Sequence, residues 1–273
     1  MKLEIRGVTK TFQSKNGALA ALDAIDLDVQ AGEFVCLLGP SGCGKSTLLN
    51  VIAGLDAPTR GQAFVDGKPI QGTGTDRVMI FQSAALFPWL SVFDNVKFGL
   101  NMTGVPKPER QTVARKYLHM VHLADFEQAS VHELSGGMQQ RVAIARALAI
   151  NPDVLLMDEP FGALDAQTRD LLHDELQTIW TETRKTILFV THNVREAVVL
   201  GDRVVVLSAR PGRIKEIFSI NLPRPRQIES YAVVDLAREI MTVMKEDVLA
   251  STRDAEASLL QEIEAQRVGD DVL

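Results

Sequence analysis

The sequence predicts an α/β fold with a mostly parallel sheet, an N-terminal antiparallel β subdomain and an inserted α-helical subdomain. Short, continuous apolar runs, typical of strands buried on both faces, alternate with segments whose apolar residues fall at helical spacing. Between residues 93 and 150 the strand pattern stops and helical spacing takes over. Alternating strands and helices favour a parallel sheet covered by helices, and the helical stretch predicts an insertion into it.

The N-terminal region has the pattern of half-buried strands. Residues 3–6 and 27–29 alternate apolar and polar or charged side chains, and residues 14–17 between them predict a turn. Residues 31–33 predict a second turn, and residues 64–67 a strand that ends in a turn.

The rest of the chain predicts the parallel sheet and its helices. The predicted strands are residues 34–38, 78–81, 154–157, 186–190, 203–207 and 214–218. The predicted helices are residues 47–53, 93–101, 109–123, 138–149, 166 to about 180, and 194–200. Asp165 is a good N-cap, because its carboxylate can accept a backbone N–H from the first turn of the helix that follows it.

Proline and arginine alternate over residues 223–226 and mark a boundary. We predict one domain over residues 1–228, with the helical subdomain at about residues 90–150, and a C-terminal helical extension over residues 229–273. The apolar residues of the extension fall at helical spacing, which predicts an amphipathic helix packed against the body. They are Leu236, Ile240, Val243 and Met244.

The composition limits the class of protein. The chain has 273 residues, a formal net charge of −6 and 46% hydrophobic residues, which is enough for a packed core. Non-specific binding of duplex DNA needs a basic surface, so we expect no nucleic-acid partner. The N-terminus lacks the apolar core of a signal peptide, and no apolar stretch is long enough to cross a bilayer. We therefore expect a cytoplasmic protein that reaches a membrane only through a partner, with Cys36 and Cys43 reduced.

A glycine-rich loop follows the buried strand 34–38 and leads into a helix. It consists of Gly39, Pro40, Ser41, Gly42, Cys43, Gly44, Lys45 and Ser46, and Thr47 follows. This order fits the phosphate-binding pattern G-x-x-x-x-G-K-[ST], in which backbone N–H groups point into one concavity. We expect Lys45 to reach the outer phosphates of ATP and Ser46 to ligate Mg²⁺. The loop predicts a P-loop NTPase core and leaves kinases, GTPases, helicases and transporters open.

A second segment supplies carboxylates. The apolar run 154–157 ends in Asp158 and Glu159. At the end of a buried strand, Asp158 is placed to hold Mg²⁺ and Glu159 to polarise the attacking water.

A third segment narrows the class further. Ser135, Gly136 and Gly137 form a second glycine-containing loop that leads into a helix, where an anion can bind. Since the first loop already serves one ATP, we expect the second to serve an ATP held by another subunit. A simple kinase has no use for this second loop.

With these motifs in this order, the chain resembles the ABC ATPase family over nearly all of residues 1–226. The resemblance implies that Phe12, in place of the more usual tyrosine, stacks on adenine. It implies that Gln82 lies near Mg²⁺ and the attacking water, and that Asp165 is the D-loop aspartate and contributes to ATP binding. It also places His192 at the γ-phosphate and gives Lys45 a catalytic role.

Local motifs resemble the importers of nitrate, sulfonates and taurine: residues 39–47 with Cys43, 86–89, 134–138 and 208–213. The resemblance implies a peripheral subunit on the cytoplasmic face of the cell membrane, working with membrane permease subunits, a second ATP-binding subunit and, indirectly, a solute-binding protein. The nutrient itself is bound by other subunits and stays open.

Three apolar side chains near Gln82 have two interpretations. Phe81, Phe87 and Trp89 as a bare cluster would favour the core. Their position after Gln82, where relatives receive the membrane subunit, favours an interface for Phe87 and Trp89. For Cys43 we expect a small filler of the loop, with a thiol pKa lowered by the phosphate-binding surroundings.

Two alternatives to an importer stay open. A soluble ABC ATPase that acts on nucleic acid or the ribosome usually has a coiled-coil insertion, zinc cysteines or tandem cassettes, and the sequence shows none of these. An exporter subunit is disfavoured only by the resemblance of residues 86–89 and 210–213.

Overall fold

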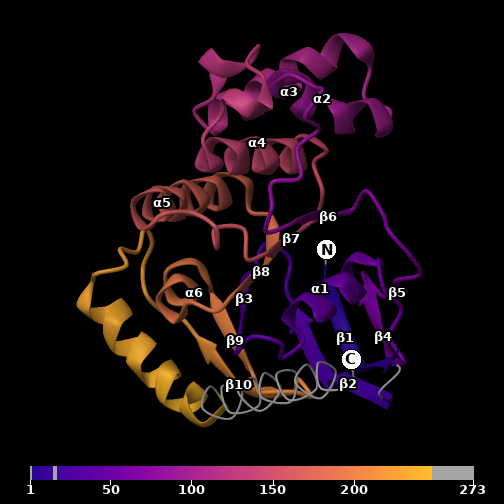
Figure 1. Ribbon diagram of the computed structural model, residues 1–273, viewed down its shortest axis with the longest axis vertical. Coiled ribbons are helices and arrows are strands. Elements are labelled where there is room, and N and C mark those ends of the chain that lie inside the picture. The colour runs from indigo at the N-terminus through magenta and orange to yellow at the C-terminus, as the bar shows by residue number, and fades with distance from the viewer. Residues whose placement is uncertain (1, 15–16, 248–273) are drawn as a thin grey trace, which may run out of the picture.

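A six-stranded sheet forms the centre of the protein (Figure 1). The computed structural model describes residues 2–14 and 17–247. The strand order is β10-β9-β3-β8-β7-β6, and all neighbours are parallel except β10, which is antiparallel to β9. The bounds are β3 Phe34–Leu38, β6 Arg77–Ile80, β7 Val154–Asp158, β8 Thr186–Thr191, β9 Arg203–Leu207 and β10 Ile214–Ser219. The predicted α/β class and mostly parallel sheet are confirmed, and each of the six strands predicted for this sheet agrees to within one residue at either end.

A second sheet is antiparallel, with the order β2-β1-β4-β5. Its strands are β1 Leu3–Ser14, β2 Gly17–Val29, β4 Arg60–Val65 and β5 Lys68–Pro69. β1 and β2 are much longer than predicted because bulges interrupt their register, so the alternation visible in the sequence covers only their outer ends. Gly7, with φ 55, lies at one such irregularity. Residues 15–16 of the predicted turn lie outside the described residues.

Three helices form a separate layer above the sheet (Figure 1). They are α2 Val92–Met102, α3 Lys107–Met120 and α4 Gly136–Ala149, and they pack on one another. Short 3₁₀ turns, Ala124–Phe126 and Val131–Glu133, connect α3 to α4. The helical insertion expected from the sequence is present, although its exact limits as a subdomain remain a prediction.

Three predicted helix starts are corrected. α1 spans Lys45–Ala53, α3 begins at Lys107 and α4 begins at Gly136, so all three start two residues earlier than predicted. α3 also ends at Met120, three residues before the predicted end. In α4 the Ser135 side chain accepts a hydrogen bond from the N–H of Met138 at 3.3 Å, which stabilises a first turn that contains Gly136 and Gly137. The predicted start lies two residues too late because glycine has a low helix propensity and was not expected in the first turn.

The four inner strands of the central sheet, β9, β3, β8 and β7, are buried on both faces, whereas β6 and β10 at its edges are more exposed. In β3, Phe34, Cys36 and Leu38 belong to one apolar cluster, while Val35 and Leu37 belong to the cluster on the other face. Burial on both faces of the sheet explains why these strands are continuous apolar runs in the sequence.

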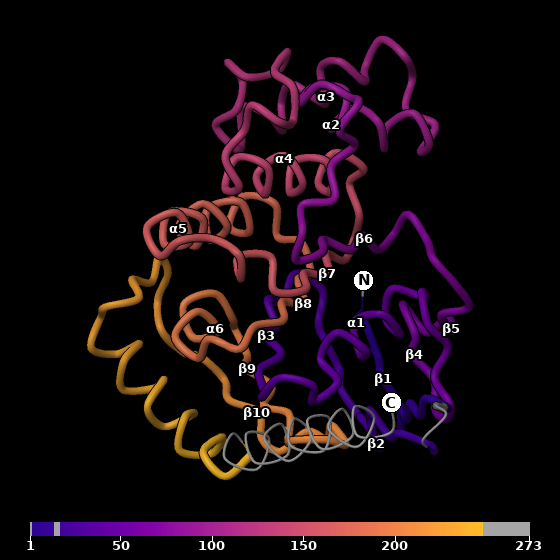
Figure 2. The backbone as a smooth tube through the Cα atoms, in the orientation of Figure 1, coloured from indigo at the N-terminus to yellow at the C-terminus, as the bar shows by residue number. Residues whose placement is uncertain are grey.

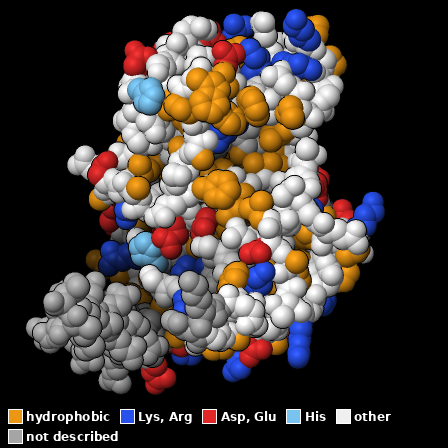
Figure 3. Space-filling model, turned by 45° about the vertical axis from the view of Figure 1, so that its right-hand side comes forward, with side chains coloured by type: hydrophobic (Ala, Val, Ile, Leu, Met, Phe, Trp, Pro, Cys, Tyr) orange, Lys and Arg blue, Asp and Glu red, His pale blue; other side chains and the backbone are white. Residues whose placement is uncertain are grey.

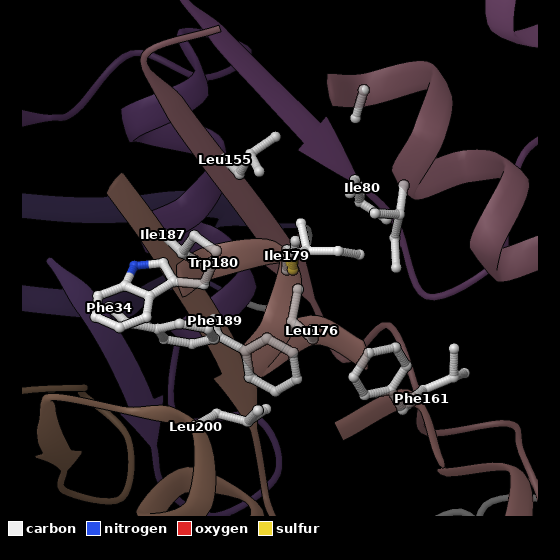
Figure 4. Packing of buried hydrophobic residues seen from close by; sticks show 14 of the residues in the cluster. Phe34, Ile80, Leu155, Phe161, Leu176, Ile179, Trp180, Ile187, Phe189 and Leu200 are labelled. Atoms are coloured by element: carbon white, nitrogen blue, oxygen red, sulfur yellow. The ribbon is translucent and has the colours of Figure 1, made fainter. Parts of the chain in front are cut away.

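The larger cluster is built around aromatic side chains (Figure 4). Trp180 of α5 (Ala166–Thr183) lies edge-on to Phe34, with ring centroids 6.3 Å apart. Phe189 of β8 packs against Phe34 at 6.0 Å and against Phe161 at 5.7 Å. α6 (Val194–Leu200) contributes Leu200 to the same cluster.

The C-terminal extension begins as a helix over residues 231–247. Of the predicted apolar stripe, Ile240 and Met244 are buried in the larger cluster and the partly buried Leu236 and Val243 pack against it, so its packing on the body is confirmed for this part. Val233 and Ala237 are buried in the same cluster. In Figure 2 the helix runs along the outer side of α6 towards β10. Residues 248–273 of the predicted extension lie outside the described residues. In the described part of the chain, no helix has the length and apolar character required to cross a bilayer.

Candidate nucleotide-binding site

The glycine-rich loop lies at the carboxyl edge of the parallel sheet, between β3 and α1. Gly44 precedes α1 with φ 99, a conformation that favours glycine. A Cβ atom there would lie 2.7 Å from the carbonyl oxygen of Ala21, so no other residue fits without displacing β2. The backbone N–H groups at the start of α1 thereby line a concavity suited to an anion.

Lys45 places a positive charge inside this loop. The residue is 5% exposed, and its Nζ donates to the carbonyl oxygens of Gly39 at 2.8 Å and Pro40 at 3.0 Å. Its remaining contact is with Cys43 Sγ at 3.9 Å, and sulfur is a weak acceptor. A phosphate oxygen would be a stronger partner for this ammonium group.

Ser46 and Asp158 offer oxygen ligands side by side. Ser46 Oγ donates to Asp158 Oδ1 at 2.9 Å. Burial raises the pKa of Asp158, the hydrogen bond from Ser46 opposes this, and the charge of Glu159 adds to it. A carboxylate that is costly to ionise gains from a bound cation, and a hydroxyl with a carboxylate suits a hard ion such as Mg²⁺.

Glu159 and His192 meet at the ends of two neighbouring strands. His192 Nδ1 and Glu159 Oε2 are 3.1 Å apart, and the Glu159 N–H donates to the carbonyl oxygen of Val190 at 3.1 Å. Glu159 has φ 45, in the left-handed region that a non-glycine residue rarely adopts. A Cβ built on Gly162 would lie 3.3 Å from Gln82 Nε2 and 3.7 Å from Glu159 Oε2. The three polar side chains therefore surround one small region.

Phe12 and the loop line a cavity of about 290 Å³. Its lining residues are Phe12, Leu19, Ala21, Ser41, Gly42, Gly44, Lys45, Ser46, Thr47, Glu159 and Arg210. Phe12 is 39% exposed and Lys10 Nζ lies 5.0 Å from its ring centroid. An exposed aromatic ring beside a phosphate-binding loop can accommodate a base and its phosphates together.

The second glycine loop lies elsewhere. Among the described residues, neither Ser135, Gly136 and Gly137 nor Asp165 lines this cavity. A Cβ on Gly137 would lie 2.4 Å from Thr168 Cγ2, so the loop packs closely on the first turn of α5. Asp165 caps that turn by accepting the Thr168 N–H at 3.0 Å, as predicted.

Sequence reasoning missed the buried polar network behind His192. Glu196 hydrogen-bonds to Thr191 and to His173, whose Nε2 is 2.7 Å from Glu196 Oε1. The Asn193 N–H donates to Thr191 Oγ1 at 2.9 Å. The network anchors the segment that carries His192, and no sequence pattern marks it, because Glu196 and His173 lie on helices among apolar residues.

The Cys43 prediction is corrected. Burial raises the pKa of the Cys43 thiol, and the charge of Lys45 only partly opposes this. Cys43 is 1% exposed. The role of a small filler agrees with this burial, whereas an activated thiol does not.

An apolar groove lies between β6, α2 and α4, with a volume of about 350 Å³. Phe87 lines it with Phe98, at a centroid distance of 4.5 Å. The Arg146 guanidinium lies 5.3 Å from the Phe87 ring and donates to the carbonyl oxygens of Ala84 and Ala85. Figure 3 shows hydrophobic side chains gathered over the helical layer of this face.

Trp89 continues the apolar surface beside this groove. It is 76% exposed and lies 5.5 Å from the Phe87 ring, so the core interpretation of Trp89 is wrong.

The parallel sheet and its loop define a P-loop nucleotide hydrolase. A family model described as "ABC transporter" matches residues 22–162. The chain is 53% identical to an uncharacterized ABC transporter ATP-binding protein of Methanocaldococcus jannaschii, covering 93% of this chain and 95% of the relative. It is 50% identical to the nitrate import ATP-binding protein NrtD of a Synechocystis strain, covering 88% and 90%. It is 49% identical to the taurine import ATP-binding protein TauB of Roseobacter denitrificans, covering 80% and 82%.

A solved structure supports the same assignment. The dimeric ATP-binding cassette MJ0796 bound to ADP and Pi matches with a TM-score of 0.71 and 34% identity, covering 81% of this chain and 100% of that chain. The chain belongs to the ABC transporter family, as an ATP-binding subunit that hydrolyses ATP.

Proposed function

We propose that this protein drives an importer, hydrolysing ATP while separate membrane subunits take up a small anionic or polar nutrient such as nitrate, taurine or a sulfonate. One observation carries the proposal. The residues expected for hydrolysis converge at one sheet edge, in a chain half identical to proteins named for nitrate and taurine import.

ATP lies in the cavity between Phe12 and the glycine-rich loop. Phe12 stacks on adenine, since stacking needs only an aromatic ring. The phosphates take backbone N–H groups and the Lys45 ammonium, which gives up its carbonyl partners. The loop residues in contact are Gly39, Pro40, Ser41, Gly42, Cys43, Gly44, Lys45, Ser46 and Thr47.

Ser46, Asp158 and Gln82 are the residues that would hold Mg²⁺. When bound, Mg²⁺ offsets charge on the phosphates. Ser46 and Asp158 are already in contact at 2.9 Å, so they need little rearrangement to present two oxygens to one ion. Gln82 approaches the same edge from the segment after β6.

Hydrolysis depends on positioning the water. Glu159 orients the attacking water and accepts its proton, while His192 holds Glu159 through Nδ1 and turns its other nitrogen to the γ-phosphate. Lys45 stabilises the charge on the leaving phosphates. The left-handed φ of Glu159 is maintained by the bond from its N–H to Val190 and aims the carboxylate at this point.

Two ATP-binding subunits work as a pair, arranged head to tail. Each ATP lies between the glycine-rich loop of one subunit and Ser135, Gly136 and Gly137 of the other, with Asp165 at the same contact. The separation of the second loop from the cavity within one chain supports this arrangement. The dimeric form of the solved relative supports it too.

The membrane subunits dock at the groove beside Phe87 and Trp89. An exposed tryptophan next to an apolar groove is typical of a protein interface. Gln82 lies a few residues before this surface and links it to the ATP site. The protein then sits at the cytoplasmic face of the cell membrane as a peripheral subunit, and a solute-binding protein outside the membrane acts on it only indirectly.

Uptake in cells tests the proposal. A strain lacking this chain is assayed for labelled nitrate, taurine, an alkanesulfonate and bicarbonate, with the wild-type protein or Glu159→Gln restored. Loss of one solute that only the wild type rescues is the expected result. Normal uptake of all four by the deleted strain would overturn the assignment to this group of nutrients.

A further inference from the structure

The loop 208–213, which joins β9 to β10, packs directly on the glycine-rich loop. The Gly212 N–H donates to the carbonyl oxygen of Ala21 at 2.9 Å, and the Asp23 N–H donates back to Gly212 at 3.0 Å. A Cβ atom on Gly212 would lie 2.1 Å from the carbonyl oxygen of Cys43. The backbones of the two loops are therefore in direct contact at Gly212 and Cys43, so a displacement of one loop displaces the other.

Arg210 extends from this loop into the nucleotide cavity. Its Nε donates to the carbonyl oxygen of Gly42 at 3.1 Å, and the residue lines the cavity together with Phe12. The terminal nitrogens of Arg210 make no hydrogen bond or ion pair with any residue in the described ranges 2–14 and 17–247. Guanidinium N–H groups that lack a partner among the described residues and lie beside a phosphate-binding loop can bind an anion.

The C-terminal helix holds the residue next to Arg210. Asp247 Oδ1 accepts the Ala209 N–H at 3.1 Å, and Asp247 Oδ2 pairs with Lys215 Nζ at 2.6 Å. Lys215 Nζ also donates to the carbonyl oxygen of Val243 at 2.8 Å. Burial of Asp247 acts against ionisation, but the bonds from Lys215 and Ala209 prevail and lower its pKa, so Asp247 is charged at neutral pH.

We infer that Arg210 is a nucleotide-binding residue and that Asp247 is its positioning residue. The inference rests on the proposed binding of ATP at the glycine-rich loop. The terminal N–H groups of Arg210 take an oxygen of the phosphate chain while Nε stays on Gly42. Asp247 fixes the backbone at Ala209 and so limits where the guanidinium can reach. The C-terminal helix thereby acts on ATP affinity from outside the site.

The position of Arg210 indicates which phosphate of the nucleotide it contacts. Arg210 lines the same cavity as Phe12, Ser46 and Glu159, but it is bonded to Gly42, whereas the contacts of the hydrolytic end join Ser46 to Asp158 and Glu159 to His192. Arg210 therefore contacts a phosphate that ADP and ATP share. Loss of its charge weakens both nucleotides equally.

The test is a calorimetric titration of ATP and of ADP into the purified full-length chain, with steady-state hydrolysis alongside. Arg210→Ala lowers affinity for both nucleotides by about 10-fold, the usual loss for a charge-assisted hydrogen bond to phosphate. Arg210→Lys recovers part of it. Asp247→Ala raises KM for ATP several-fold, more than it lowers kcat. Asp235→Ala is the matched control, since Asp235 lies on the same helix in an exposed pair with Arg238 and leaves both affinities unchanged.

A double variant distinguishes a positioning role of Asp247, which acts through Arg210, from a structural role that is independent of Arg210. Arg210→Ala with Asp247→Ala binds no more weakly than Arg210→Ala alone, because Asp247 acts through Arg210. Additive losses, or a lower Tm for either single variant with unchanged affinity, overturn the inference. Lys45→Ala keeps the two proposals apart. If Lys45→Ala retains full affinity, the ATP site itself is misassigned; if it loses affinity while Arg210→Ala does not, only the inference fails.

Discussion

Ser46 Oγ lies 2.9 Å from Asp158 Oδ1, although 112 residues separate the two in the chain. Ser46 lies in the first turn of α1, after β3, and Asp158 ends β7, which is separated from β3 by β8. Parallel strands end at the same edge of a sheet, so residues distant in sequence meet there. The contact joins the phosphate loop to the end of β7, where Asp158 and Glu159 lie.

Asp158→Asn should stabilise the nucleotide-free protein and remove its activity. Burial raises the pKa of Asp158, so above that pKa the ionised carboxylate is less favourable in the folded chain than in the unfolded one. Asn removes this cost and still accepts the Ser46 hydroxyl. Hydrolysis should fall by about 100-fold or more, because the Mg²⁺ ligand is lost.

Thermal melts of the wild type and of Asp158→Asn at several pH values test the predicted direction of the change in stability. The gain in Tm should be full at neutral pH and vanish as the pH falls below 3.8, the ordinary pKa of the group, because Asp158 is then protonated in both states. Asp153→Asn, an exposed change at the other end of β7, should leave Tm unchanged. A lower Tm for Asp158→Asn at neutral pH would contradict the argument.

Glu159→Gln should bind ATP, pair with a second subunit and turn over at least about 100-fold more slowly, the size of a general-base contribution. The amide keeps the shape of the side chain and can still meet His192, but cannot accept a proton from water. Single-turnover hydrolysis with size-exclusion chromatography in ATP measures both effects. Glu216→Gln, exposed on β10, is the control, and normal turnover by Glu159→Gln would remove Glu159 from its role.

Cys43 should react slowly with a thiol reagent in the folded protein at neutral pH. Its pKa is raised by burial, and only the thiolate attacks. Peptide mapping after iodoacetamide treatment separates Cys43 from Cys36, which burial also makes less acidic. Both should label quickly once the protein is unfolded. Rapid labelling of Cys43 in the folded protein, blocked by ATP, would instead support the activated thiol that the sequence predicts.

The sequence anticipated what depends on short patterns. Strands buried on both faces are continuous apolar runs, so the sequence predicts β3, β8 and β9 to within one residue. The full length of β1 and β2 cannot be predicted in this way, because bulges break the alternation that identifies a strand. The burial of Cys43 depends on Gly39 and on β9, which no local pattern reveals. Arg210 belongs to a sequence motif, but only the contact of its loop with Gly42 gives it a place in the cavity.

Trp89→Ala should leave basal ATP hydrolysis intact and weaken assembly with the membrane subunits. Trp89 is 76% exposed and its ring lies 5.5 Å from the Phe87 ring at the edge of the groove, so its loss removes apolar contact area without opening the core. Tyr231→Ala is the matched control, since Tyr231 is 93% exposed on the C-terminal helix. Co-purification with the membrane subunits, alongside the hydrolysis rate, measures the difference. Assembly equal to that of the wild type would mean that the membrane subunits dock elsewhere. Reduced assembly for Trp89→Ala alone would place the contact at the surface that follows Gln82, where docking can reach the hydrolytic end of the ATP site.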